Sequence, residues 1–183
     1  MECYPDMRNC DCSRAHVLIS IVLTLFTPLA NAEAVTGRVV GITDGDTVSL
    51  LVERQQYTIR IAGIDAPERH QAWGDRSKSN LSRLCLNQSA VADCSRISQR
   101  GLMICRLTVK TVDIGLEQLK DGMAWWDKEL AREQTPEDQS AYQSAELMAQ
   151  LNRRGLWRET NPMPPWEFRR ENRVFPEKSD LRF

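Results

Sequence analysis

The stretch Asp44-Gly-Asp-Thr47, followed by Tyr57-Thr-Ile-Arg-Ile61 and Asp65-Ala-Pro-Glu68, decides how this chain folds. Asp-Gly predicts a tight hairpin turn, because glycine accepts the positive φ that such a turn requires. The segments around this turn are rich in β-branched and apolar side chains, which favour strands. We therefore expect three consecutive strands, at residues 35–42, 48–52 and 57–61.

Three carboxylates and one arginine lie on or beside these strands: Asp46, Asp65, Glu68 and Arg60. If the strands pair, these side chains converge at one end of a sheet. Oxygen ligands in that arrangement suit a hard cation such as calcium. A free carboxylate beside an arginine suits the attack of water on a phosphodiester. Each piece alone is common in turns and solvated loops, so the information lies in their combination.

The rest of the chain predicts a small α+β domain. Two more strands are expected after a first helix, and two further helices follow, the last starting at Thr135 with Pro136 in its first turn. Five short strands with a helix between the third and the fourth suggest a five-stranded Greek-key β-barrel of the OB type, with about three helices. The expected later elements are a helix at 77–86, strands at 90–94 and 102–109, and a helix at 113–120.

The order and spacing of Asp44-Gly-Asp-Thr47, Arg60 and Asp65-Ala-Pro-Glu68 resemble the active-site signature of the staphylococcal nuclease family, also called thermonucleases or micrococcal-type nucleases. The resemblance covers about residues 35–157. Residues 161–168 are similar to an extension found in some secreted bacterial members. The resemblance implies the same OB-type barrel with three helices.

The resemblance also implies a calcium-dependent endonuclease that cleaves DNA, RNA or both and leaves a 5′-hydroxyl and a 3′-phosphate. The carboxylates of Asp46 and Asp65 and the carbonyl of Ala66 would bind the calcium ion, and the Thr47 hydroxyl would support them. The expected partner is therefore nucleic acid, and we expect the protein to act as a monomer.

For catalysis, the resemblance assigns Glu68 to activate or orient the attacking water and Arg60 to clasp the phosphate oxygens. The family uses a second arginine, which an ungapped alignment places on Leu102. Arg100 lies on the same face of an extended strand, because side chains alternate, and is the candidate to replace it. The departure at Leu102 predicts slow cleavage.

Two other functions stay open. The first is an OB-fold protein that binds nucleic acid but cleaves it weakly or not at all, which Leu102 favours. The second is a secreted interaction module with no nucleic-acid role. The adjacent Trp125 and Trp126 also have two interpretations, either a stacking platform for bases or a core residue with a lid over it.

The chain divides into a signal peptide at residues 1–32, a nuclease-like OB-fold domain at 33–158 and a Pro/Arg-rich C-terminal extension at 159–183. We expect the extension to be extended, pinned by Trp166 and Phe168. Its arginines either contact phosphates or form a solvated tail: Arg169, Arg170 and Arg173.

Formal net charge is −1, so any contact with nucleic acid must be local. Three cysteines follow the signal segment, and an odd number leaves one thiol over. We expect a bridge between Cys85 and Cys94, with Cys105 buried and reduced.

The apolar run at residues 17–26 and the small-residue site Ala30-Asn-Ala32 predict export to the periplasm or the medium of a bacterium, with no stable membrane association afterwards. N-terminal sequencing of the exported protein should give Glu33 as the first residue. An exported protein that begins at Met1 or Met7 would contradict cleavage at this site.

Overall fold

The computed structural model describes residues 34–97 and 102–174. The expected signal segment at 1–32 and the catalytic candidate Arg100 lie outside these residues, as does the side chain of Arg173.

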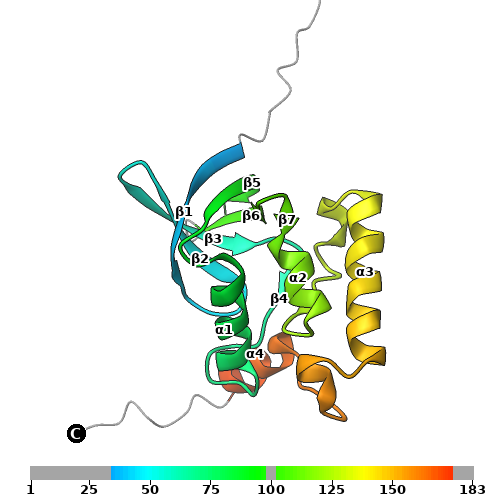
Figure 1. Cartoon of the computed structure of the whole chain (residues 1–183). Coiled ribbons are helices and arrows are strands. Elements are labelled where there is room, and N and C mark those ends of the chain that lie inside the picture. Colours follow the sequence, from blue (N-terminus) through cyan, green and yellow to red (C-terminus); the bar gives the residue numbers. More distant parts are fainter. Residues whose placement is uncertain (1–33, 98–101, 175–183) are drawn as a thin grey trace, which may run out of the picture. The chain divides into compact units, whose positions relative to one another are not determined.

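Within the described residues, five strands close into a barrel (Figure 1). The first three form an antiparallel meander, and the third pairs in parallel with the last, which is antiparallel to the fourth. The fourth also pairs with the first and so completes the closure. The predicted α+β fold with a five-stranded OB-type barrel is confirmed. The barrel strands are β1 (Ala34–Ile42), β2 (Thr47–Val52), β3 (Gln55–Ile61), β5 (Ser89–Ile97) and β6 (Met103–Val109).

Short strands extend this framework. β7 (Val112–Asp113) continues the sheet beyond β6, and β4 (Ile64–Asp65) pairs with β8 (Trp125–Trp126) in a separate two-stranded ladder. This ladder fixes the chain direction after β3, so that Asp65 lies beside the barrel rather than in a free loop.

The described part of the chain also contains four α-helices and two 3₁₀ turns. The side chain of Thr135 caps the third helix, as the sequence pattern predicts, and the side chain of Asp113 caps the second. The first helix begins at Gly74, three residues before the start expected at residue 77. The elements are α1 (Gly74–Cys85), α2 (Ile114–Lys120), η1 (Ala131–Glu133), α3 (Pro136–Leu151), η2 (Gly155–Arg158) and α4 (Pro165–Val174).

The extension contradicts its predicted extended conformation, because residues 165–174 form α4. Pro165 opens this helix, where its fixed φ suits the first turn and its missing N–H costs nothing. The backbone N–H groups of Glu167 and Phe168 donate to the Pro164 carbonyl, both at 3.1 Å. The prolines therefore start a helix here instead of preventing one.

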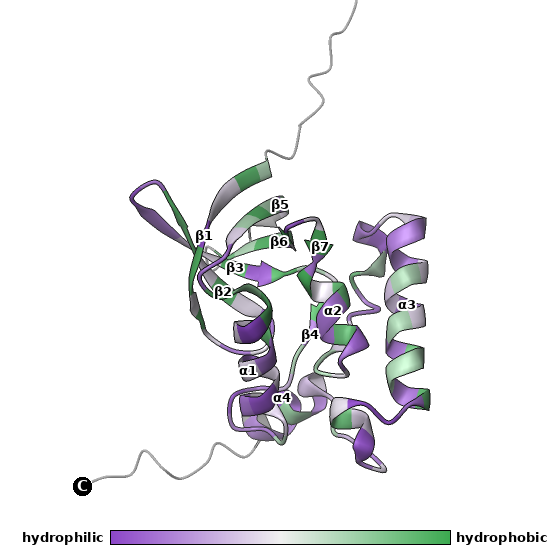
Figure 2. Cartoon of the chain, in the orientation of Figure 1, coloured by the Kyte–Doolittle hydropathy of each residue, from purple (hydrophilic) through white to green (hydrophobic). Residues whose placement is uncertain are grey.

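The hydrophobic core fills the barrel and continues under α1, α2 and α3. Figure 2 shows bands of hydrophobic and hydrophilic residues along the strands, the alternation of a sheet with one face in the core. Among the described residues, no helix combines the length and apolar character that crossing a bilayer requires. Fully buried large side chains include Val39, Leu50, Ile59, Ile61, Leu81, Leu107, Ile114 and Leu119.

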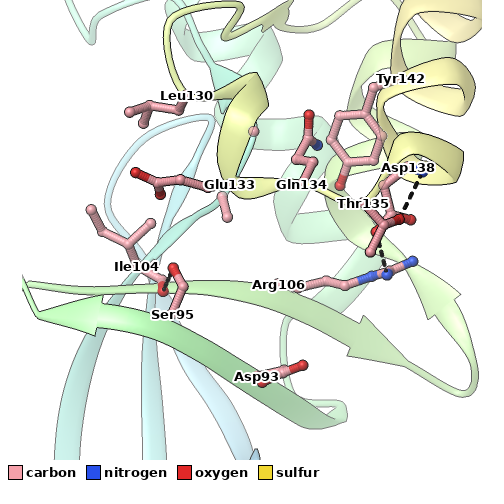
Figure 3. Close-up of a pocket in the computed structure, with 12 residues that line it drawn as sticks. Asp93, Ser95, Ile104, Arg106, Leu130, Glu133, Gln134, Thr135, Asp138 and Tyr142 are labelled. Atoms are coloured by element: carbon pink, nitrogen blue, oxygen red, sulfur yellow. Dashed lines mark hydrogen bonds and ion pairs between the residues drawn. The ribbon is translucent and has the colours of Figure 1, made fainter. Parts of the chain in front are cut away.

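A polar network attaches α3 to the barrel. Tyr142 donates to both carboxylate oxygens of Asp113, at 3.0 and 3.1 Å. Arg106 on β6 pairs with Asp138 at 3.0 Å and with Asp113 at 2.8 Å, and Figure 3 shows its side chain reaching Asp138. Arg106 and Asp138 both line a pocket of about 260 Å³. Burial and the charge of Asp113 raise the pKa of Tyr142 far above its usual range. Tyr142 therefore stays a neutral donor.

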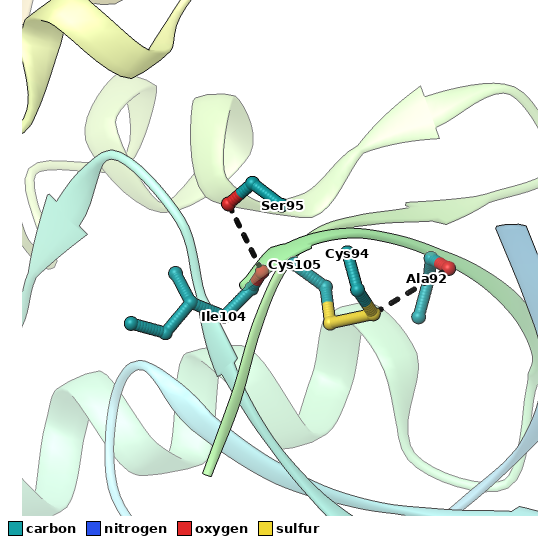
Figure 4. Close-up of a disulfide and its surroundings, with 5 residues drawn as sticks. All are labelled: Ala92, Cys94, Ser95, Ile104 and Cys105. Carbon is teal, nitrogen blue, oxygen red and sulfur yellow. Dashed lines mark hydrogen bonds between the residues drawn. A yellow bond between two sulfur atoms is a disulfide. The ribbon is translucent and has the colours of Figure 1, made fainter. Parts of the chain in front are cut away.

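The predicted disulfide is wrong. The structure joins Cys94 to Cys105 (Figure 4). It leaves Cys85 free and buried. The reason is strand register, because Cys94 on β5 lies directly opposite Cys105 on β6. Cys85 ends α1 inside the core, and burial raises the pKa of its thiol to about 12.

This arrangement predicts the reactivity of each cysteine. A non-reduced digest should contain a peptide pair joined through Cys94 and Cys105. Iodoacetamide at pH 8 should label Cys85 only after unfolding, because its thiol is buried and protonated. A reduced and denatured sample, labelled at all three sites, is the control. A bridge to Cys85, or its rapid labelling in the native state, would contradict the assignment.

Candidate functional site

The turn between β1 and β2 carries the first site residue. Asp46 is buried, and its N–H donates to the Asp44 carboxylate at 3.1 Å. Gly45 does not have the positive φ that the sequence suggested. Only glycine fits at this position, because a Cβ there would overlap the side chains of Ser77 and Ala66. The turn is therefore shaped by crowding against α1 and the chain after β4.

A buried glutamine holds this turn from outside. Gln118 on α2 is fully buried, and its amide donates to the Gly45 carbonyl at 2.6 Å. The same amide approaches the Ser77 carbonyl on α1 at 3.3 Å, while its oxygen accepts from Asn80 at 2.6 Å. Gln118 thus ties two helices to the turn that presents Asp46. The sequence analysis missed this residue.

Strand pairing brings the predicted residues together. Thr47 lies opposite Arg60 in the β2–β3 register. The Asp46 carboxylate accepts from the Thr47 hydroxyl at 2.8 Å and from the Ala66 N–H at 3.0 Å. One Arg60 nitrogen, Nη2, lies 3.3 Å from Asp46 Oδ2 and 2.8 Å from Asp65 Oδ1. Two buried carboxylates therefore share one guanidinium.

The charges in this cluster are not balanced. Burial raises the pKa of Asp46 to about 7; Arg60 opposes this rise, and the neighbouring carboxylates of Asp44 and Asp65 reinforce it. Burial acts to lower the pKa of Arg60, but its attraction to Asp46 and Asp65 outweighs that effect and raises the pKa. Additional positive charge beside these carboxylates would lower the pKa of Asp46 toward its usual range.

Glu68 lies on the loop that follows β4, and an arginine from the C-terminal extension reaches it. Arg169 on α4 donates to Glu68 Oε1 at 2.7 Å. It also forms a bidentate pair with Asp65, at 3.1 Å to Oδ1 and 2.7 Å to Oδ2. These hydrogen bonds raise the pKa of Arg169, and the one to Asp65 has the largest effect. The sequence left two interpretations of the extension's arginines, contact with phosphates or a solvated tail. Arg169 is not part of a solvated tail, because it is paired with Asp65 and Glu68.

A cleft of about 490 Å³ opens beside this cluster. Trp125 packs edge-on against Trp157, with ring centroids 5.5 Å apart, and against Trp166 of α4 at 6.3 Å. Trp126 belongs to the hydrophobic core. The cleft is lined by Arg60, Asp65, Trp125, Trp126, Asp127, Lys128, Glu129, Glu146, Gln150, Trp157, Trp166 and Arg169.

Asp127 is a further acidic residue that the sequence analysis missed. It follows β8 directly, and its N–H donates to the Gly63 carbonyl at 3.0 Å, which places it across from β4. Burial raises the pKa of its carboxyl, and the nearby Asp65 adds to this rise. The one sequence feature that could have pointed to Asp127 is its position directly after Trp126.

Arg100, the candidate to replace the family's second arginine, lies outside the described residues. Leu102, where the family's arginine was expected, lies half-buried just before β6. The described cluster therefore contains Arg60 and Arg169 as its arginines.

Comparison with known proteins gives one family model and several curated relatives that match this chain. A family model described as staphylococcal nuclease homologue matches residues 58–159, which include Arg60, Asp65 and Glu68. The chain is 34% identical over 166 residues to an uncharacterized endonuclease of Haemophilus influenzae, covering 86% of this chain and 87% of that protein. It is 32% identical over 146 residues to a micrococcal nuclease of Shigella flexneri, covering 75% and 82%.

The position of Gln118 predicts a loss of stability on mutation. Gln118→Leu should lower the free energy of unfolding by about 1–3 kcal/mol, because it leaves buried carbonyls without a donor. Urea denaturation measures this change. Gln143→Leu, at an exposed position of α3, is the matched control and should stay within about 0.5 kcal/mol of the parent. Equal stabilities of the two variants would show that Gln118 does not hold the turn.

Proposed function

The chain belongs to the staphylococcal nuclease family and is an endonuclease of it, and on this premise we propose that it cleaves DNA, RNA or both by calcium-dependent hydrolysis. The observation that carries the proposal is the convergence of Asp46 and Asp65 on one nitrogen of Arg60. We also propose that it acts as a monomer after export.

The donor set supports a hard cation. The described residues contain no group of three or more His, Cys, Asp or Glu side chains placed to hold a metal. The set consists instead of the carboxylates of Asp46 and Asp65 with the carbonyl of Ala66, all hard oxygen donors. Calcium takes about six to eight oxygen ligands, and waters can supply those that the protein does not.

When bound, the ion would supply positive charge to the phosphate oxygens. Arg60 donates two parallel hydrogen bonds to the phosphate, which a planar guanidinium can do and which strengthen as negative charge develops. Thr47 keeps the Asp46 carboxylate oriented through its hydroxyl hydrogen bond.

Glu68 orients the attacking water and takes its proton. The water oxygen bonds to phosphorus as the bond to the 5′ oxygen breaks, and the proton is finally carried by that leaving oxygen. The products are a 3′-phosphate and a 5′-hydroxyl. Glu68 suits this role because its side chain is about one third exposed, unlike the buried Asp46 and Asp65.

A nucleic-acid-binding protein with weak cleavage is the second candidate. Two observations favour it: Leu102 stands where the family's second arginine was expected, and Glu68 is paired with Arg169. Both proposals place the nucleic acid in the same cleft. They differ in the rate at which the protein cleaves it.

Plasmid nicking with calcium or chelator separates these functions. Calcium should be required, and Asp46→Ala should abolish cleavage by losing the ion. Glu68→Gln should retain calcium binding by calorimetry and lose about 10²–10⁴-fold in rate, the usual worth of a general base. Glu171→Gln, exposed on α4, is the matched control and should keep the parent's rate.

Full cleavage in chelator would refute the calcium assignment. Binding of an oligonucleotide without any cleavage would favour the second candidate.

A further inference from the structure

We propose that Arg169, carried into the active site by α4, is a second phosphate-binding arginine that acts together with Arg60 on the scissile phosphodiester. This inference rests on the proposed function and adds to it a residue from the C-terminal extension. Arg169 lies beyond residues 58–159, the range that the family model matches.

Hydrogen bonds attach the C-terminal extension to the domain just before α4, the helix that carries Arg169. The Gln71 amide donates to the Met163 carbonyl at 2.6 Å, and the Trp73 indole donates to Glu159 at 2.6 Å. Gln71 also accepts from the Glu68 N–H at 3.0 Å, so one buried side chain holds both the Glu68 loop and the start of α4. The position of Arg169 relative to Glu68 is therefore built into the fold.

The two arginines meet at one carboxylate. Arg60 Nη2 lies 2.8 Å from Asp65 Oδ1, and Arg169 Nη1 lies 3.1 Å from the same oxygen. Their positive charges repel each other, and the site tolerates them because carboxylates lie between. An anionic phosphate has several oxygens and can accept from both guanidiniums at once, which matches their fork-shaped donor geometry.

Arg169 is accessible to a substrate. Its side chain is 34% exposed and that of Arg60 is 30% exposed, and both line the cleft with the tryptophans. Trp166 lies on the same helix three residues earlier and forms part of the same wall. Helix α4 thus presents a cation and an aromatic ring to one cleft, the two groups that single-stranded nucleic acid engages.

The contacts in the free protein indicate how the arginine works. Arg169 exchanges one anionic partner for another when a phosphodiester enters, and it stays protonated throughout. This exchange releases Glu68 for the attacking water and an oxygen of Asp65 for a cation. A contrasting possibility is that Arg169 only blocks the carboxylates, in which case its removal would speed cleavage.

The test compares Arg169→Ala, Arg169→Lys and the parent in calcium. Cleavage by Arg169→Ala should fall about 10²–10³-fold in kcat/KM, the usual loss for one donor to a developing negative charge. Arg169→Lys should recover part of this, because lysine keeps the charge and loses the bidentate geometry. Arg54→Ala is the matched control; it is exposed in the turn at the opposite end of the β2–β3 hairpin from Arg60 and should keep the parent's rate.

Binding gives a readout that does not depend on turnover. In the Glu68→Gln background with chelator, a fluorescent single-stranded oligodeoxynucleotide should bind Arg169→Ala more weakly than the unsubstituted background. The slope of log K against log salt should also be smaller by about 0.7, the value for one lost phosphate contact on a single strand.

Two outcomes overturn the inference. Faster cleavage and tighter calcium binding by Arg169→Ala would assign Arg169 a blocking role, and unchanged kinetics and binding would assign it none. If the parent itself does not cleave, the proposed function fails, while the oligonucleotide comparison still decides whether Arg169 contacts phosphate. Thermal melting accompanies both assays, and Arg169→Lys, which keeps the ion pairs, decides the matter if Arg169→Ala does not fold.

Discussion

The site depends on one interaction, the guanidinium of Arg60 held between the carboxylates of Asp46 and Asp65. Taking two carboxylates out of water is costly unless positive charge and hydrogen bonds accompany them. The barrel meets this requirement by pairing Thr47 with Arg60 across β2 and β3, which places Asp46 beside the arginine. The β4–β8 ladder then delivers Asp65 to the other side of the same nitrogen. The cluster is consequently a product of strand register.

The polar groups around the cluster connect the helices to the site. Gln118 on α2 and Ser77 on α1 close over the Asp44–Asp46 turn, so the helices pack against the site as well as against the core. Gln71 connects the Glu68 loop to the chain that leads into α4. The C-terminal extension is thereby joined to the site by hydrogen bonds, and its prolines serve to start a helix rather than to keep the segment extended.

Two features that the sequence analysis did not predict share a cause. Both the Cys94–Cys105 bridge and the Arg169 contact depend on which residues face each other after folding. Cys94 and Cys105 are opposite because β5 and β6 pair in one register, and a sequence states the spacing of cysteines but not this register. Gly45 was correctly identified as important but for the wrong reason, since crowding by Ser77 and Ala66 matters there rather than a positive φ.

The sequence by itself determined the barrel and the capped start of α3, and it singled out the candidate set Asp46, Arg60, Asp65 and Glu68. Those features follow from local patterns: strand alternation, capping side chains, and short polar motifs that lie directly at strand ends. Only the tertiary structure decided the disulfide, the burial that raises the pKa of Asp46, and the arrival of Arg169 about a hundred residues after Asp65. Desolvation and long-range ion pairs depend on the packing of segments far apart in the chain, and no local pattern carries that information.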